Sequence, residues 1–250
     1  MGFSRVAWKM TNLKPNGSCA YITFRYNSSN GDQGFPGDVR AEVTYIINEN
    51  YHLSINMKAQ TLNKATPMNM ATHLYWNLNG HMSGNISSEQ LQLFASKITN
   101  VDEELVPDGT FSVVNNTPYD FHEPVKIGTQ LEKLPDPTKV GSVRGFDINY
   151  VVDGYQESDK HRMKKVAILY DEKSGIKMEL NATAPGVQLF TANSLKDRKG
   201  KEGALYQAYA GVCLETQDFP DAVNHKNFPT TIITKDNPYY HSMSISFTTM

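Results

Sequence analysis

The chain has 250 residues, with 24 basic and 26 acidic side chains and a formal net charge of −2 at pH 7. This length is enough to bury a sizeable core and is typical of an all-β architecture folded as one unit. The near balance of charge, without a basic stripe, argues against nucleic acid as a partner. No apolar run approaches the roughly 20 residues that a membrane-spanning helix needs, so we expect no membrane partner.

The cysteine content is low. Cys19 and Cys213 are too few for a disulfide framework, which is typical of a reducing compartment. The first ten residues contain no apolar segment of the signal-peptide type. A cytoplasmic location is therefore the default expectation.

The sequence is patterned for β-strands throughout. Alternating runs rich in aromatic and β-branched residues predict strands and hairpins. In chain order these are a strand at 4–10, a strand at 19–29, a hairpin at 39–59, a hairpin at 164–182 and a strand at 240–249. Helical periodicity is scarce, and 125–134 is the best candidate for a helix. We expect one antiparallel domain over 1–250, with sheets stacked face to face.

Common catalytic motifs are missing from the sequence. It contains no GxGxxG, P-loop, HExxH, CxxC or GxSxG pattern. Its seven histidines have no close metal-ligand spacing. The sequence therefore predicts no metal site from ligand spacing, and only ligands that the fold brings together from distant segments stay open.

The segment 71–81, ATHLYWNLNGH, sets a histidine among large apolar side chains. Alternation in an extended chain places His73, Tyr75 and Asn77 on one polar face, and the leucines and the tryptophan on the other. From these residues alone, a structural histidine that bonds a backbone carbonyl is favoured over a catalytic one.

Three more polar side chains occur beside apolar runs. Glu215 follows a hydrophobic run, and a carboxylate is costly to bury there without a partner. From these residues alone, a structural role and a functional role for Glu215 are equally favoured. Asp147 precedes an apolar strand, a place where aspartate is most often a turn residue. Gln188 alternates with valine and leucine, as a cross-strand hydrogen-bonding residue would.

Together these segments resemble the aldose 1-epimerase family, the galactose mutarotases. THLYWNLNGH is similar to the family block H-x-Y-[FW]-N-L-x-G-H, and GFDINYVVD is similar to Y/F-D-H-N-[FY]-V-L. PGVQLFTAN is similar to P-G-x-Q-F-Y-T-G-N, and GVCLETQDFPDAVNH to the family's glutamate block. The blocks keep the family order from about Phe3 to Phe247, and the plant branch is the most similar.

The resemblance implies a large antiparallel β-sandwich, also called a supersandwich, of the galactose mutarotase type. It implies an isomerase that interconverts the α and β anomers of an aldohexose such as galactose or glucose. Neither a cofactor nor a metal takes part. The partner is a small-molecule sugar, and the chain is expected to be a monomer or a weak dimer.

The resemblance also assigns roles to residues. Glu215 aligns with the general base and His73 with the general acid. Asp147 and Gln188 align with residues that bind sugar hydroxyls, and Tyr75 lies in the substrate-contacting segment. We expect burial to raise the pKa of Glu215. We also expect the base and the acid to straddle the ring, one on each side of the C1–O5 unit.

The sequence departs from the family in three ways. It lacks a counterpart of the family's first quarter, which carries an arginine and a histidine that contact substrate. Ile148 stands where the family usually has histidine, a change expected to alter the polarity of the cleft, and Ala192 replaces a glycine. Two alternatives therefore stay open: a catalytically impaired carbohydrate-binding protein, and an isomerase of the same fold that acts on a non-sugar metabolite.

Overall fold

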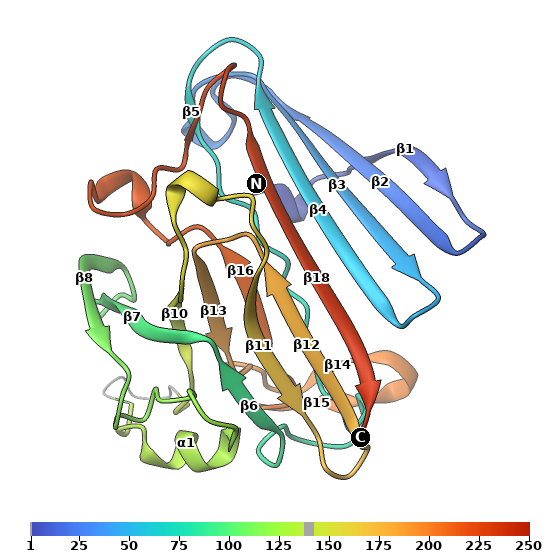
Figure 1. The fold of residues 1–250 in the computed structure, drawn as a ribbon, viewed down its shortest axis with the longest axis vertical. Coiled ribbons are helices and arrows are strands. Elements are labelled where there is room, and N and C mark those ends of the chain that lie inside the picture. Colours follow the sequence, from blue (N-terminus) through green and yellow to red (C-terminus); the bar gives the residue numbers. More distant parts are fainter. Residues whose placement is uncertain (1, 138–142) are drawn as a thin grey trace.

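The computed structural model describes residues 2–137 and 143–250, and antiparallel β-sheet dominates it (Figure 1). The larger sheet has nine strands in the order β1-β2-β3-β4-β18-β12-β11-β6-β9. Its strands are β1 (Lys9–Lys14), β2 (Cys19–Ser28), β3 (Val39–Asn48), β4 (His52–Thr61), β6 (Gln90–Leu93), β9 (Val125–Lys126), β11 (Lys164–Tyr170), β12 (Ile176–Ala182) and β18 (Tyr239–Thr249).

A second sheet has five strands in the order β16-β13-β10-β7-β8. Its strands are β7 (Ala95–Val101), β8 (Pro107–Val113), β10 (Asp147–Val152), β13 (Gly186–Phe190) and β16 (Cys213–Gln217). Short strands form two small ribbons, β14 (Arg198–Lys199) with β15 (Leu205–Tyr206), and β5 (Thr66–Pro67) with β17 (Ile232–Ile233). The helical segments are α1 (Ile127–Lys133) and the 3₁₀ turns Phe3–Arg5, Asp32–Gly34, Glu157–Asp159, Lys201–Gly203 and Ala222–Asn224.

Most of the expected elements are confirmed. The hairpin at 39–59 is formed by β3 and β4, and the hairpin at 164–182 is formed by β11 and β12. The closing strand is β18, and the helix at 125–134 is α1. Local alternation and turn residues are enough to specify these elements, because each pairs with its neighbour along the chain or shows its own period.

The strand expected at 4–10 is wrong. Residues Phe3–Arg5 form a 3₁₀ turn, and β1 begins only at Lys9. The indole of Trp8 donates a hydrogen bond to the carbonyl oxygen of Phe3 at 2.9 Å. The rings of Phe3 and Trp8 also contact Tyr26, at centroid distances of 5.1 and 5.7 Å. These aromatic contacts fold the segment back, so that it does not extend into a strand.

The two large sheets share one hydrophobic cluster. Side chains from β4, β12 and β18 of the larger sheet and from β10, β13 and β16 of the smaller one belong to it. This cluster holds the sandwich together by removing apolar surface from water. The predicted all-β sandwich is therefore confirmed. None of the helices in the described residues is long and apolar enough to cross a membrane.

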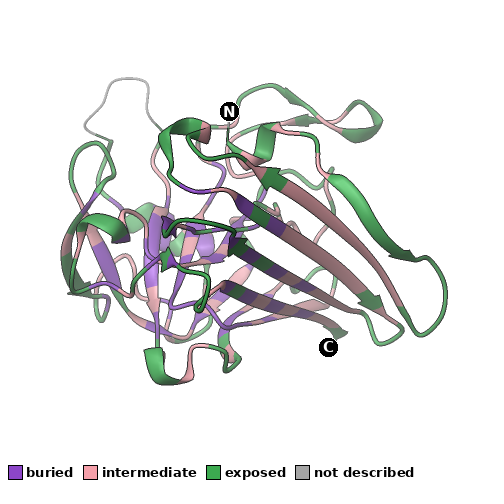
Figure 2. Cartoon of the chain, turned by 90° about the horizontal axis from the view of Figure 1, so that it is seen from above, coloured by how far each residue is buried: buried purple, intermediate pink, exposed green. Residues whose placement is uncertain are grey.

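Burial is uneven across the molecule. In Figure 2 the buried residues gather where the two sheets overlap, whereas the outermost strands of the larger sheet are mostly exposed or half-buried. Every residue of β1 is exposed, and β2 has no fully buried residue. The inner strands β10, β13 and β16 are mostly buried. These inner strands carry the candidate site.

Candidate active site

Three neighbouring strands present their polar side chains on the same face. Gln188 of β13 is paired in register with Glu215 of β16, and Asp147 of β10 is paired with Phe190 of β13. Since paired residues of antiparallel strands share a face, and residues two apart share it too, these side chains lie together. The residues between them, including Leu189, point to the hydrophobic core.

His73 reaches this face from a separate segment. The backbone groups of Trp76 and Val212 exchange two hydrogen bonds of 2.8 Å, which fasten the segment beside the start of β16. Gly211 permits the close approach, since a Cβ there would lie 3.2 Å from the Cβ of Tyr75. The segment 71–81 pairs with the chain at the start of β16 through this isolated bridge only and does not form a strand. The predicted alternation of its side chains between two faces is nevertheless confirmed. His73 and Tyr75 are exposed on one side.

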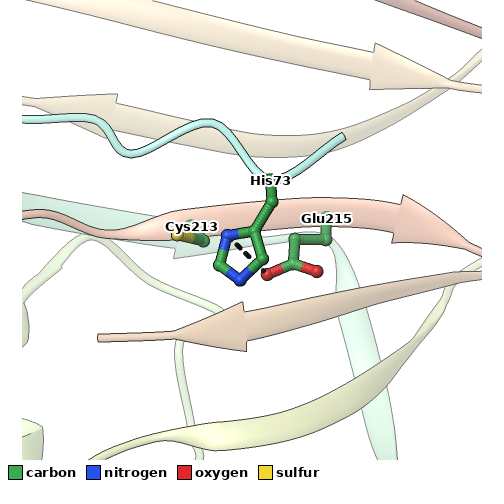
Figure 3. Close-up of side chains that lie close together, drawn as sticks. All are labelled: His73, Cys213 and Glu215. Carbon is green, nitrogen blue, oxygen red and sulfur yellow. Dashed lines mark ion pairs between the residues drawn. The ribbon is translucent and has the colours of Figure 1, made fainter. Parts of the chain in front are cut away.

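The imidazole of His73 contacts the carboxylate of Glu215, with 3.4 Å between Nδ1 and Oε1 (Figure 3). The His73 side chain is 54% exposed and that of Glu215 is 14% exposed. The imidazole ring stacks on Tyr75, with centroids 4.9 Å apart and planes 13° apart. The edge of Phe190 meets it at 5.9 Å. Two aromatic rings thus fix the orientation of the histidine.

The contact between His73 and Glu215 corrects one expectation. The two groups do not stand apart by the width of a sugar ring, because their atoms are 3.4 Å apart. The hydroxyl oxygen and the ring oxygen at the anomeric centre of a pyranose are attached to the same carbon. Two adjacent groups can therefore reach both oxygens from one side, and no straddling geometry is needed.

The site makes the carboxyl group of Glu215 harder to ionise. Burial, and secondarily the charge of Asp147, raise the pKa of Glu215 to about 7. The shift has the predicted direction and cause. The carboxylate of Asp147 accepts a hydrogen bond from the Gln188 amide at 2.8 Å, so these two side chains are already held in one geometry.

Asn149 is a polar residue that the sequence reasoning did not assign to the site. It lies on the same face as Asp147 and opposite Gln188, and it is 2% exposed. Its amide nitrogen and oxygen, and the side-chain oxygen of Gln188, have no hydrogen-bond partner among the described residues. Buried polar atoms without partners are costly, so we regard them as groups prepared for a ligand or for water.

Ile148 does not affect the cleft in the way that the sequence suggested. It is 7% exposed and belongs to the hydrophobic core. Because neighbouring residues of a strand point to opposite faces, Ile148 points away from Asp147 and Asn149. The expected change in cleft polarity at this position is therefore wrong.

A buried histidine ties β16 to the larger sheet. His241 of β18 is hydrogen-bonded through Nε2 to the hydroxyl of Thr216 at 2.9 Å and through Nδ1 to the hydroxyl of Thr183 at 3.1 Å. Burial lowers the pKa of His241 to about 4, so it is neutral at pH 7. Thr216 is the neighbour of Glu215 on the opposite face of β16. The anchor therefore fixes the strand that carries the carboxylate.

A neighbouring cavity of about 1000 Å³ is a different feature. It lies between the larger sheet and the segment 66–74, and its lining is mostly apolar. His73 is one of the residues that line this cavity, whereas Glu215, Asp147 and Gln188 do not line it. The polar face on β10, β13 and β16 is therefore the better candidate for a site that performs acid–base chemistry.

Cys213 completes a set of possible metal ligands. Its sulfur, a ring nitrogen of His73 and a carboxylate oxygen of Glu215 all lie within 4.8 Å of one another. One signal for this grouping is present in the sequence, since Cys213 and Glu215 are two residues apart in β16 and share a face. The spacing of histidines along the chain carries no information on it.

The fold defines the class of protein. A GalM/aldose epimerase homologue from C. elegans matches with a TM-score of 0.83 and 23% identity, over 97% of this chain and 69% of that one. Galactose 1-epimerase from Lactobacillus acidophilus matches with a TM-score of 0.78 and 20% identity, over 97% of this chain and 66% of that one. The chain thus has the galactose mutarotase type of β-sandwich.

Sequence comparison narrows this class to a family. The family model for aldose 1-epimerase matches residues 2–246. Human galactose mutarotase is 36% identical over 247 residues, which cover 98% of this chain and 67% of that protein. Aldose 1-epimerase of Escherichia coli is 29% identical, over 91% of this chain and 62% of that protein. The chain belongs to the aldose 1-epimerase family, and it spans about two thirds of the length of the curated relatives that it matches.

Proposed function

We propose that this protein is an aldose 1-epimerase that interconverts the α and β anomers of an aldohexose such as galactose or glucose. The observation that carries the proposal is the 3.4 Å contact between His73 and Glu215, in a chain of this family. An acid and a base at this separation match the two oxygens of one anomeric centre. The reaction needs no cofactor, because the C1–O5 bond opens and closes within one molecule while two protons move, without any change in oxidation state.

The reaction begins with ring opening. The carboxylate of Glu215 takes the proton from the C1 hydroxyl, and the C1 oxygen forms a carbonyl as the C1–O5 bond breaks. The imidazolium of His73 gives its proton to O5, which becomes a hydroxyl. Rotation about C1–C2 then presents the other face of the aldehyde, and the two proton transfers reverse to close the ring. Each positioned group accelerates such a step by roughly 10²–10⁴-fold.

The remaining side chains hold the sugar. Asp147 and Gln188 offer acceptors and a donor to ring hydroxyls, and the open-chain aldehyde stays bound while it rotates. Tyr75 and Phe190 give an aromatic surface next to His73, suited to the C–H face of a pyranose. A raised pKa places Glu215 near the pH at which a base both accepts a proton and returns it.

Polarimetry on freshly dissolved α-D-galactose tests the proposal. The protein should accelerate the approach to the equilibrium rotation, and Glu215→Gln should reduce kcat by roughly 10²-fold or more. Glu103→Gln, in an exposed turn, is the matched control and should keep full activity. Circular dichroism of each variant shows whether it is folded.

The two alternatives predict different results. A catalytically impaired carbohydrate-binding protein would bind galactose in calorimetry without accelerating mutarotation. An isomerase for a non-sugar metabolite would leave every aldose unchanged and would lose another isomerisation when Glu215 is replaced. The contact between His73 and Glu215 favours catalysis, since a protein that only binds sugar has no need of an adjacent acid and base.

A further inference from the structure

The proposed reaction leaves one polarisable group unused. The Cys213 side chain is fully buried, and in the view of Figure 3 its sulfur lies beside the His73 imidazole, on the side away from the Glu215 carboxylate. The sulfur, the ring nitrogen and the carboxylate oxygen lie within 4.8 Å of one another. Proton transfer to and from a sugar involves the nitrogen and the oxygen only. The thiol therefore raises the question of what else can bind here.

We propose that His73, Cys213 and Glu215 form an inhibitory site for Zn²⁺. Zinc is bound by imidazole nitrogen, thiolate sulfur and carboxylate oxygen, and many of its sites have three protein ligands and one open position. Mg²⁺ and Ca²⁺ prefer a shell of oxygen atoms, so this mixed set selects against them. The open fourth position would hold water.

The observed distances suit a tetrahedral ion. Zinc bonds of about 2.0–2.2 Å to nitrogen and oxygen place those two ligand atoms about 3.4 Å apart. The Nδ1 atom of His73 and the Oε1 atom of Glu215 are 3.4 Å apart. The sulfur must come to within about 3.6 Å of the nitrogen, and the three ligand atoms already lie within 4.8 Å of one another.

Two features of the fold favour this set. Cys213 and Glu215 are two residues apart in β16, so the strand fixes their spacing. The aromatic contacts of Tyr75 and Phe190 restrain the third ligand. When Zn²⁺ binds, it displaces to water the thiol proton and, where Glu215 is protonated, the carboxyl proton. One thiolate, one carboxylate and a neutral imidazole then balance the two charges of the ion.

The consequence is competition with the sugar. Zinc occupies the lone pairs of Glu215 and His73, which are the groups that the proposed reaction uses. The inhibited chain cannot take the C1 proton or protonate the ring oxygen. Inhibition should be reversed by a chelator and should weaken as the galactose concentration rises.

Cobalt spectroscopy tests the site without any activity measurement. Co²⁺ added to the chelator-treated chain should give the near-ultraviolet charge-transfer absorption of a cobalt–thiolate bond, and an excess of Zn²⁺ should remove it. Cys213→Ser should abolish the band, whereas Cys19→Ser, which replaces the exposed cysteine, should keep it. No band in the unmodified chain, or a band that depends on Cys19, would overturn the proposal, and the first result requires no variant to fold.

Inhibition is the second readout, and it rests on the proposed function. Loss of outer-shell support alone costs roughly 10–100-fold in metal affinity. Loss of a ligand in Cys213→Ser should therefore raise the half-inhibiting Zn²⁺ concentration by at least about tenfold, when inhibition is expressed relative to the zinc-free activity of the same variant. Equal inhibition of Cys213→Ser and the unmodified chain, or equal inhibition by Mg²⁺, would contradict the proposal. A cobalt band in a chain without mutarotase activity would refute the proposed function and leave the metal site standing.

Discussion

The inner strands β10, β13 and β16 differ from the outer strands β1, β2 and β3 in how they handle polar side chains. The inner strands place Asn149 and most of Glu215 out of water, above a packed core. The charged residues of the outer strands are exposed or half-buried, and β1 has no buried residue at all. The same hydrogen-bonded ladder runs through both regions, so strand pairing alone does not make a site.

A site of this kind requires a strand that is held firmly in place. Raising the pKa of a carboxyl group costs stability when the group is ionised, and a weakly packed strand would move to solvate it. Strand β16 is held by β13 on one side, by the core below and by the Thr216–His241 contact. Strands β2 and β3 are paired on both sides, but no residue of β1 or β2 is fully buried, so an acid on these two strands would stay in contact with water.

Removing one apolar side chain from each region should affect stability very differently. Leu189→Ala in β13 removes a fully buried side chain and should lower the free energy of unfolding by about 2–5 kcal/mol. Leu13→Ala in β1, where the side chain is 49% exposed, should change it by less than about 0.5 kcal/mol. Urea denaturation measures both. Similar losses for the two variants would show that β1 is as firmly packed as β13.

The second prediction concerns the pH dependence of catalysis. The proposed base acts as a carboxylate, and its pKa is raised to about 7. Below that pH the group is protonated, so kcat/KM for mutarotation should fall about tenfold for each further pH unit. Polarimetry in buffers of constant ionic strength measures the profile. A rate that stays constant well below pH 7 would mean that the inner strands do not hold Glu215 in an unfavourable environment.

Local patterns in the sequence predict part of the fold and part of the candidate site. Alternation correctly placed His73 and Tyr75 on one side of their segment, and the two long hairpins follow from local patterns. Burial of Asn149 depends on strands that are distant in sequence, and no local pattern reports it. The turn at Phe3 arises from contacts with Tyr26. Local periodicity cannot register contacts of this kind, because they form only after the chain has folded.

The sequence did not predict the grouping of Cys213 with His73, for the same reason. Metal-ligand spacing is a rule for ligands that are close along the chain. Here one ligand comes from the segment that docks on β16, and the other two lie in the strand itself. The face of each residue could be derived from alternation, but the docking of the two segments could not. The resemblance to a family supplied the pair of His73 and Glu215, and it gave no reason to consider Cys213.

A third prediction concerns backbone strain next to β13. Ala192 is fully buried and has a φ of 52°, a left-handed conformation that costs a residue with a side chain roughly 1–2 kcal/mol. Ala192→Gly removes this cost but loses a buried methyl group and increases the entropy of the unfolded chain. We expect the free energy of unfolding to rise by about 0.5 kcal/mol.

Ala182→Gly in β12 is the matched control. Ala182 is also fully buried, but its φ is not positive. Glycine in a strand interior should lower the free energy of unfolding by roughly 0.5–1 kcal/mol or more. Thermal denaturation of both variants measures the difference. Two changes of the same sign would show that the region of the site stores no strain at Ala192.

The smallest expected effect lies in the outer strands. Arg25 of β2 and Glu42 of β3 form an ion pair, with 2.6 Å between Nη2 and Oε1, and the two side chains are 39% and 27% exposed. Solvent screens such a pair, so Glu42→Gln should lower the free energy of unfolding by less than about 0.5 kcal/mol, and added salt should reduce the loss further. A double-mutant cycle with Arg25→Met isolates the coupling between the two side chains. A coupling energy well above 1 kcal/mol would mean that charges in the outer strands are shielded from water as strongly as Glu215 is, and the contrast between the two regions would then rest on packing alone.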